Sequence, residues 1–430
     1  MIRIPVSYIE NLSAWRRNFH RYPEPGWLEF RTTAQIADRL ESLGYDVFVG
    51  QDIGIGERLG LPSKEEIQLF YERAKKLGAN EKWLAKMEGG YTGAIAVLDT
   101  GIPGPTVAFR VDIDALPIRE SEESHHVPQQ EGFRSEYDGF MHACGHDSHA
   151  SIGLGLAEQI MVHRNLLKGK VKIIFQPAEE GVRGAAALVE SPLLCDIDYL
   201  FAMHIGTGVE KGLFIAGTDG FFATSKYDVA LSGLAAHAGA YPERGKNALL
   251  ASAQAALALH ALPHHSGGAS RINVGTLQAG AGRNVIPSSA HMQLELRGET
   301  TEIVNYYEEK MLDVFEGIAK MYDVEVSYKK VGSAISVPSD ASLAAVLAKT
   351  ANELNIKYID YETFKAGSED ATFLMKKVQD RGGQATYSIM GTHLPVGHHH
   401  ECFDIDEEDM LPAIEIWLNT LISLSKETSK

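Results

Sequence analysis

Residues 148–175 read SHASIGLGLAEQIMVHRNLLKGKVKIIF and indicate the fold class. An apolar helix is predicted over residues 148–162, and an apolar strand over 171–175 follows it after a short polar loop. Strands that alternate with helices in this way predict a largely parallel sheet covered on both faces. The alternation extends to both sides, with strands predicted at 94–98, 106–111 and 199–203 and a helix at 185–189.

Residues 227–328 follow a different pattern and predict a second, smaller domain. The order strand, helix, strand, strand, helix, strand is that of the ferredoxin-like α+β unit. Helical patterns and an apolar strand resume after it, so we expect this domain to be inserted into the first. The predicted boundaries are 1–218 and 332–430 for an α/β sandwich with a mostly parallel sheet, and 219–331 for an inserted lid or dimerisation domain.

The composition is that of a globular protein and disfavours several partners. The 430 residues are 44% hydrophobic and 23% charged, which suits two or three domains. The formal net charge of −17 repels phosphate backbones and anionic lipid surfaces. No stretch reaches the ~20 apolar residues of a membrane span, and the first residues lack a secretory signal pattern. We therefore expect neither a nucleic acid nor a membrane partner.

The chain contains only three cysteines, Cys144, Cys195 and Cys402. An odd and small number in a chain of this length argues against a disulfide framework. This usage predicts a reducing compartment, which we take to be the cytoplasm.

Metal-ligand residue types are concentrated in residues 142–149, HACGHDSH. Imidazole and thiolate are common ligands of zinc-type ions, and Cys144 and His146 on either side of one glycine can direct both donor atoms to one point. A single histidine is more often structural. Four ligand-type side chains within eight residues instead favour a metal site.

Two adjacent carboxylates follow the strand at 171–175, in the sequence FQPAEEG of residues 175–181. Glu179 and Glu180 cannot both point the same way, so one can bind a metal while its neighbour faces the reacting water. Hydrolysis requires this division of roles. A solvated glutamate pair on a turn is the alternative.

Other polar residues also follow predicted strands, where ligand clefts form in open α/β sheets. His204 follows the strand at 199–203, and the run 398–400 is HHH. This run is internal and continues as ECFDID, which argues against a tag fragment. Asp112 and Asp114 close another strand, and their spacing places both on one side, where they could orient ligating histidines.

Taken together, the motifs resemble the amidohydrolase branch of the aminoacylase and carboxypeptidase metallopeptidase family. The resemblance covers nearly the whole chain. It rests on eight blocks in this order: FRVDIDALP, MHACGHDSH, FQPAEEG, HIGTG, GLAAHAG, GRNVIP, AGSEDA and HHHECFD.

The resemblance implies a dinuclear metal site and a general base. Cys144 would take the bridging position, and Glu179 would be the base that activates the attacking water and then protonates the leaving amine. His399 is chosen from the histidine run by counting back four residues from Phe403, although His400 stands where the family more often has Asn. The implied ligands of the two ions, manganese or zinc, are Cys144, His146, Glu180, His204 and His399.

Three residues of the smaller domain match positions that contact the substrate in the family. His237 would donate to the oxyanion, often across a dimer interface; the alternative is a structural histidine in a turn. Asn284 and Arg297 would bind the substrate's carboxylate, although Arg297 could equally be a surface strand residue.

The expected activity is metal-dependent hydrolysis of the amide bond of N-acyl or N-aroyl amino acids. A closer resemblance over residues 56–93 and 217–226 implies p-aminobenzoyl-glutamate as the leading substrate. One alternative is a broader N-acyl-amino-acid or peptide amidohydrolase. Another is a non-catalytic partner subunit, which the intact Glu179–Glu180 pair disfavours. The resemblance implies a homodimer or a heteromer with a related B subunit.

Overall fold

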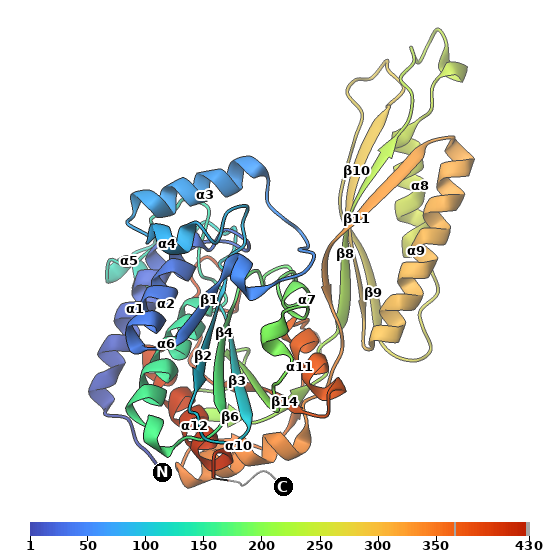
Figure 1. Cartoon of the computed structure of the whole chain (residues 1–430). Helices are drawn as coiled ribbons and strands as arrows, with labels where there is room; N and C mark the ends of the chain where they lie inside the picture. Colours follow the sequence, from blue (N-terminus) through green and yellow to red (C-terminus); the bar gives the residue numbers. More distant parts are fainter. Residues whose placement is uncertain (365–366, 427–430) are drawn as a thin grey trace. The chain divides into compact units, whose positions relative to one another are not determined.

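The computed structural model describes residues 1–364 and 367–426, which form two compact units (Figure 1). Unit 1 lies in Met1–Asp219, Val337–Phe364 and Asp370–Lys430, and unit 2 in Gly220–Ser336 and Lys365–Glu369. The second unit therefore interrupts the chain of the first. Whether unit 2 acts as a lid or in dimerisation stays a prediction.

An eight-stranded sheet forms the centre of unit 1. Its four central strands, β4, β3, β5 and β14, are mutually parallel, whereas β1, β2 and β6 pair antiparallel near the two edges. The carboxyl ends of the parallel strands consequently meet at one edge of the sheet. The order across the sheet is β1 (Asp46–Val49), β2 (Ala94–Asp99), β4 (Lys170–Gln176), β3 (Thr106–Asp112), β5 (Tyr199–Ile205), β14 (Gln384–Met390), β6 (Leu213–Ile215) and β12 (Lys357–Ile359).

Helices cover both faces of this sheet, which confirms the predicted fold class. Figure 1 shows α1, α2, α6 and α12 on one face and α7 and α11 on the other. The apolar side chains of α6 and α12 join those of the sheet in one core, where Trp417 packs on Phe109 with ring centroids 5.1 Å apart. The helices are α1 (Ile9–Arg21), α2 (Phe30–Leu43), α6 (His146–Val162), α7 (Ala185–Leu188), α10 (Ala341–Glu353), α11 (Ala371–Asp380) and α12 (Met410–Leu424).

The polar stretch 51–90 carries two further helices, α3 (Lys64–Lys76) and α4 (Glu81–Leu84). Ser63 begins α3 with a capping box, in which its side chain accepts from the Glu66 amide and the Glu66 side chain accepts from the Ser63 amide. Phe70 and Trp83 of these helices are buried in the core of unit 1. A short helix, α5 (Val127–Gln130), follows β3.

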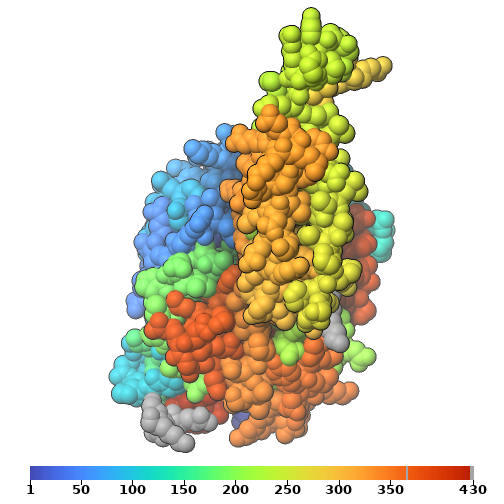
Figure 2. All heavy atoms as spheres, turned by 90° about the vertical axis from the view of Figure 1, so that its right-hand side faces the viewer, coloured from blue at the N-terminus to red at the C-terminus, as the bar shows by residue number. Residues whose placement is uncertain are grey.

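Unit 2 has the predicted βαββαβ order. Its four-stranded antiparallel sheet has the order β11-β8-β10-β9, which is the ferredoxin-like arrangement. Figure 1 shows α8 and α9 side by side on one face of this sheet, and in Figure 2 the atoms of the two segments lie next to each other. The elements are β8 (Ala223–Ser232), α8 (Ala248–His260), β9 (Ser270–Ala279), β10 (Ser289–Gly298), α9 (Thr301–Tyr322) and β11 (Glu325–Ala334).

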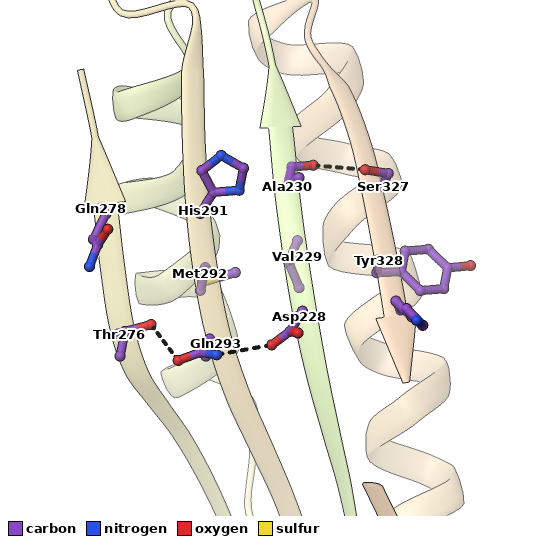
Figure 3. A pocket seen from close by; sticks show the side chains of 11 residues that line it. Asp228, Val229, Ala230, Thr276, Gln278, His291, Met292, Gln293, Ser327 and Tyr328 are labelled. Carbon is purple, nitrogen blue, oxygen red and sulfur yellow. Dashed lines mark hydrogen bonds between the residues drawn. The ribbon is translucent and has the colours of Figure 1, made fainter. Parts of the chain in front are cut away.

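The two faces of the unit 2 sheet differ in polarity because side chains alternate along each strand. Met292 and Leu294 on β10 point to the helices and are buried. The opposite face carries His291 and Gln293, and Gln293 donates a hydrogen bond to Asp228 (3.2 Å) on the neighbouring strand β8 (Figure 3). These residues help to line a pocket of about 610 Å³ on this face. The sheet of unit 2 thus has an apolar face, which packs against the helices, and a polar face.

Among the described residues, no helix combines the length and the apolar character needed to cross a bilayer.

Candidate active site

The start of α6 places Cys144 and His146 side by side. Gly145 is the N-cap of this helix and has a φ of 88°, a conformation that favours glycine. A Cβ added there would lie only 2.8 Å from Cγ2 of Ile205 in β5. A glycine at this position therefore lets the loop pass close to the sheet. It also places His146 in the first turn of the helix.

Donor atoms of Cys144, His146 and Glu180 converge within 4.8 Å of one another. Nε2 of His146 and Oε1 of Glu180 are buried and have no hydrogen-bond partner among the residues that the structure describes. Buried polar atoms normally have such a partner, because leaving them unpaired costs about 1–3 kcal/mol. A sulfur, an imidazole nitrogen and a carboxylate oxygen facing one point fit a zinc-type or manganese ion.

His204 extends this group on the other side of Cys144. Its Nε2 lies 3.4 Å from Sγ of Cys144, and its Nδ1 donates to the carbonyl of Ile205 (2.7 Å). This hydrogen bond leaves the lone pair on Nε2, where a ligand to a metal needs it. Burial, and then the neighbouring His149, lower the pKa of His204 well below its usual value, so the imidazole is neutral at pH 7.

Two histidines of the 398–400 run approach these residues in different ways. His399 Nε2 lies 3.5 Å from Oε1 of Glu180, and the His399 amide donates to the Ala143 carbonyl (2.7 Å). His398 also has a ring nitrogen near Cys144 and His204. However, Nε2 of His398 accepts a hydrogen bond from the backbone amide of Thr207 (2.9 Å). Of these two histidines, His398 shares a donor group with Cys144 and His204, so the choice of His399 as a ligand stays a prediction.

Asp112 and Asp114 contact the histidines of α6. His146 donates from Nδ1 to the Asp114 carbonyl (3.0 Å), which directs its Nε2 to Cys144 and Glu180. Asp112 accepts from Nδ1 of His149 (2.5 Å), whose Nε2 in turn accepts from the Ile205 amide (2.9 Å). Burial would raise the pKa of Asp112, but His146, His149 and Arg110 outweigh it and hold the pKa well below its usual value.

The loop that carries Glu179 and Glu180 is held by three buried carboxylates. Asp114 accepts from the backbone amides of both glutamates, at 3.0 and 2.9 Å. Glu29 accepts from the amide of Ala178 (2.7 Å), a residue with a φ of 53°. The third carboxylate, Asp370, accepts from the amides of Gly184 (3.0 Å) and Ala185 (2.9 Å). Anchoring on both sides explains how adjacent glutamates keep different orientations.

The electrostatics of this region oppose an unpaired thiolate. Burial, and then the carboxylates of Glu180 and Glu179, raise the pKa of Cys144 well above its usual value. Without a cation the thiol therefore keeps its proton. Binding of a metal ion to this sulfur would release that proton, so metal affinity should rise with pH.

The predicted substrate residues lie in unit 2. His237 pairs with Val285 in an isolated antiparallel bridge, and the Ala238 amide donates to the Asn284 carbonyl (3.0 Å). Nδ1 of His237 accepts from the amides of Gly239 and Ala240, at 3.2 and 3.0 Å. In the neutral ring the proton is therefore on Nε2, which can donate.

Arg297 has a partner within its own strand. Its Nε lies 2.8 Å from Oε2 of Glu295, and its Nη2 donates to Oε1 of the same carboxylate (3.0 Å). Both side chains are partly exposed. A substrate carboxylate would have to replace or share this contact.

Sequence reasoning gave no role to three residues that shape the site: His149, Glu29 and Asp370. His149 lies in the HACGHDSH block, and its i, i+3 spacing from His146 in α6 was a usable signal. Glu29 and Asp370 are far from Glu179 in sequence, so no local pattern links them to its loop.

Comparisons with known proteins identify the family. The profile of Peptidase family M20/M25/M40 matches residues 108–423. An indole-3-acetyl-aspartic acid hydrolase from Enterobacter agglomerans is 48% identical over 95% of this chain and 94% of its own length. A p-aminobenzoyl-glutamate hydrolase subunit from Escherichia coli (strain K12) is 47% identical over 97% and 96%, respectively.

Two solved structures are similar as well. An aminobenzoyl-glutamate utilization protein from Klebsiella pneumoniae has a TM-score of 0.83 and 43% identity, over 97% of this chain and 96% of that one. A Bacillus subtilis protein described as a dinuclear metal binding peptidase of the M20 family has a TM-score of 0.67 and 26% identity, over 98% and 99%.

Proposed function

The chain belongs to Peptidase family M20/M25/M40, and we propose that it hydrolyses the amide bond between an aromatic acyl group and an acidic amino acid. The observation that carries this proposal is the convergence of Cys144, His146 and Glu180 beside a second carboxylate on Glu179. Two of the buried donor atoms have no hydrogen-bond partner among the described residues. Metal-dependent hydrolysis requires a set of metal ligands. It also requires a nearby carboxylate that is not a ligand.

The proposed ligands of two divalent cations are Cys144, His146, Glu180, His204 and His399. When bound, the cations would polarise the amide carbonyl and lower the pKa of the attacking water. The sulfur of Cys144 favours zinc, whereas the carboxylate and the imidazoles also suit manganese. Either metal therefore fits the donor set.

Glu179 is the proposed general base. Its neighbour Glu180 is directed to His146 and Cys144, and Asp114 holds the backbone of both glutamates. In this role the Glu179 carboxylate takes a proton from the attacking water and delivers it to the leaving amine nitrogen. The Glu179 carboxyl group carries out both proton transfers, so the reaction needs no second acid.

His237 is the proposed donor to the oxyanion, and Asn284 and Arg297 are the proposed contacts of the substrate's carboxylate. The two backbone amides that donate to Nδ1 of His237 support the first role, because they leave the Nε2 proton available. The planar guanidinium of Arg297 already binds the Glu295 carboxylate through two nitrogens, which is the geometry that a substrate carboxylate would use.

The leading substrate is p-aminobenzoyl-glutamate, and a specific observation favours indole-3-acetyl-aspartate as a second candidate. The names of two relatives that are 47% and 48% identical to this chain refer to these two compounds. Both have an aromatic acyl group and an acidic amino acid. A broader range of N-acyl amino acids or peptides is the remaining alternative for the same site.

A second polypeptide is part of the proposal. The name of the Escherichia coli relative describes it as one subunit of its hydrolase, which implies a partner for that protein. In this chain, Leu250 and Leu257 on α8 are exposed apolar side chains that a second copy or a related B subunit could cover. We place the protein in the cytoplasm, where free cysteines such as Cys144 stay reduced.

The test is an assay of the purified chain loaded with manganese or with zinc. We expect release of p-aminobenzoate from p-aminobenzoyl-glutamate, or of aspartate from indole-3-acetyl-aspartate, by the chain alone. A chain that binds two metal ions but cleaves neither compound, with either metal, would instead be a non-catalytic subunit. Adding a candidate B subunit then shows whether activity requires the pair.

A further inference from the structure

A second group of metal-ligand residue types lies in unit 1, outside the candidate active site. It forms where residues 120–126 meet the segment 400–402. The amide of Ser121 donates to the Glu401 carbonyl (3.0 Å) and joins the two segments. Arg134 donates to the carbonyls of Glu120 (2.8 Å) and Ser121 (3.1 Å), which holds the first segment from its other side. Two loops that are far apart in sequence are thus fixed against each other.

At this junction, donor atoms of Glu123, His125 and Cys402 lie within 4.8 Å of one another. Nδ1 of His125 is 3.2 Å from Oε2 of Glu123. The side chains of Glu123 and His125 are exposed, at 63% and 72%, whereas Cys402 is of intermediate exposure in this group. The group therefore combines the soft sulfur of Cys402 with a nitrogen donor of His125 and an oxygen donor of Glu123 from the surface loop.

We propose that Glu123, His125 and Cys402 form a surface site for one zinc ion. A thiolate, an imidazole and a carboxylate are the three side-chain types that bind zinc, and three protein ligands leave a fourth position for water. None of the three belongs to the proposed catalytic site. An ion pair between His125 and Glu123 would not need Cys402, whereas a zinc ion uses all three residues.

The position of the proposed zinc site indicates which segment a bound ion would stabilise. Cys402 is three residues after His399, the proposed ligand of the catalytic centre. An ion bound to His125 and Cys402 would cross-link residues 120–126 to this segment and reduce its local unfolding. Zinc at this site would thus stabilise the loop that carries His399 without itself taking part in hydrolysis.

The first experiment measures zinc protection of Cys402 from alkylation in the full chain, already loaded with its two active-site metal ions. Iodoacetamide labelling is followed by mass spectrometry of the Cys402 peptide, with Cys195 as the internal reference. We expect zinc at ten times its dissociation constant to slow labelling of Cys402 about tenfold. His125→Ala should abolish the protection, and the exposed His264→Ala in unit 2 should keep it.

The second experiment counts zinc ions and does not depend on access of a reagent to the Cys402 sulfur. Competition with a chromophoric chelator should find one zinc ion more in the unmodified chain than in Cys402→Ser or Glu123→Gln. Equal stoichiometry in all three proteins would overturn the proposal, and so would protection that persists in His125→Ala. Because neither measurement uses turnover, the result is independent of the proposed hydrolase activity.

Discussion

The proposed metal ligands of unit 1 and the proposed substrate contacts of unit 2 are organised differently. His146 and His204 are buried, and each has one ring nitrogen bound to a backbone carbonyl before any metal arrives. His237 is exposed in a loop, and the Arg297 side chain contacts Glu295 of its own strand, with both side chains partly exposed. The proposed metal ligands are therefore oriented by the core of unit 1, whereas the proposed substrate contacts are side chains exposed to solvent.

The largest effect should come from removing the proposed base. Glu179→Gln keeps the shape of the side chain but cannot accept the proton, so we expect turnover to fall about 10³- to 10⁴-fold. Because Glu179 is not a proposed ligand, both metal ions should remain. Steady-state kinetics and elemental analysis of the same sample check the two statements.

The matched control is the neighbouring Glu180→Gln. Oε1 of Glu180 is one of the unpaired buried atoms, so this variant should lose metal as well as activity. If Glu179→Gln loses metal while Glu180→Gln keeps it, the assigned roles of the two carboxylates are reversed. Normal turnover in Glu179→Gln would remove the base assignment altogether.

Unit 2 should show a different pattern when His237 is changed. His237→Ala removes the Nε2 donor, and we expect kcat to fall about 10²- to 10³-fold with little change in KM or metal content. His237→Gln should recover part of the rate, because an amide can also donate. Unchanged kinetics in His237→Ala would identify a structural histidine, held by the amides of Gly239 and Ala240.

Unit 1 should show a pH-dependent stability that comes from His20. His20 in α1 lies between the carboxylates of Glu120 (2.9 Å) and Asp147 (2.8 Å). Burial alone would lower the pKa of His20, but the two carboxylates outweigh it and raise the pKa to about 9. The unfolded chain loses this proton near pH 6.5. Between these pH values the folded state binds more protons, so the free energy of unfolding should fall as pH rises.

The size of this effect follows from the shift of the His20 pKa to about 9, and is on the order of 3 kcal/mol. Denaturant unfolding of the metal-free chain at pH 6.5 and pH 9 measures the total loss, and His20→Gln should make that loss smaller by about this amount. The control, His264→Gln, changes an exposed histidine of unit 2 and should keep the full loss. Hydrogen exchange should locate the change in α1 and α6. An equal loss in His20→Gln would contradict the assignment.

The sequence predicted features that depend on local pattern. The alternation around residues 148–175 predicted the parallel sheet, and the βαββαβ order predicted the sheet of unit 2. The short strands β6 and β12 were not predicted, because three residues carry too little periodicity. Helix α12 was missed as well. It is apolar on nearly all sides, so it lacks the amphipathic pattern of a surface helix.

In the candidate site, too, local motifs predicted some residues and could not predict contacts between distant segments. Cys144 and His146 were found because ligand types cluster in a short motif, and the family resemblance selected Glu180 from the glutamate pair. The structure brings the three together. The hydrogen bonds of Glu29 and Asp370 to the glutamate loop could not be predicted. They join segments separated by 149 and 186 residues, and only folding creates these pairs.

The smallest effect should come from Arg297, where two outcomes separate a substrate contact from a surface residue. Arg297→Ala should raise KM about fivefold to tenfold at unchanged kcat, since the guanidinium would bind only the substrate's carboxylate. Glu295→Gln should act in the opposite direction. It removes a partly exposed ion pair worth up to about 1 kcal/mol, which frees Arg297 and lowers KM up to about fivefold. Opposite shifts require that substrate and Glu295 compete for one guanidinium, whereas an unchanged KM in both variants would make Arg297 a surface strand residue.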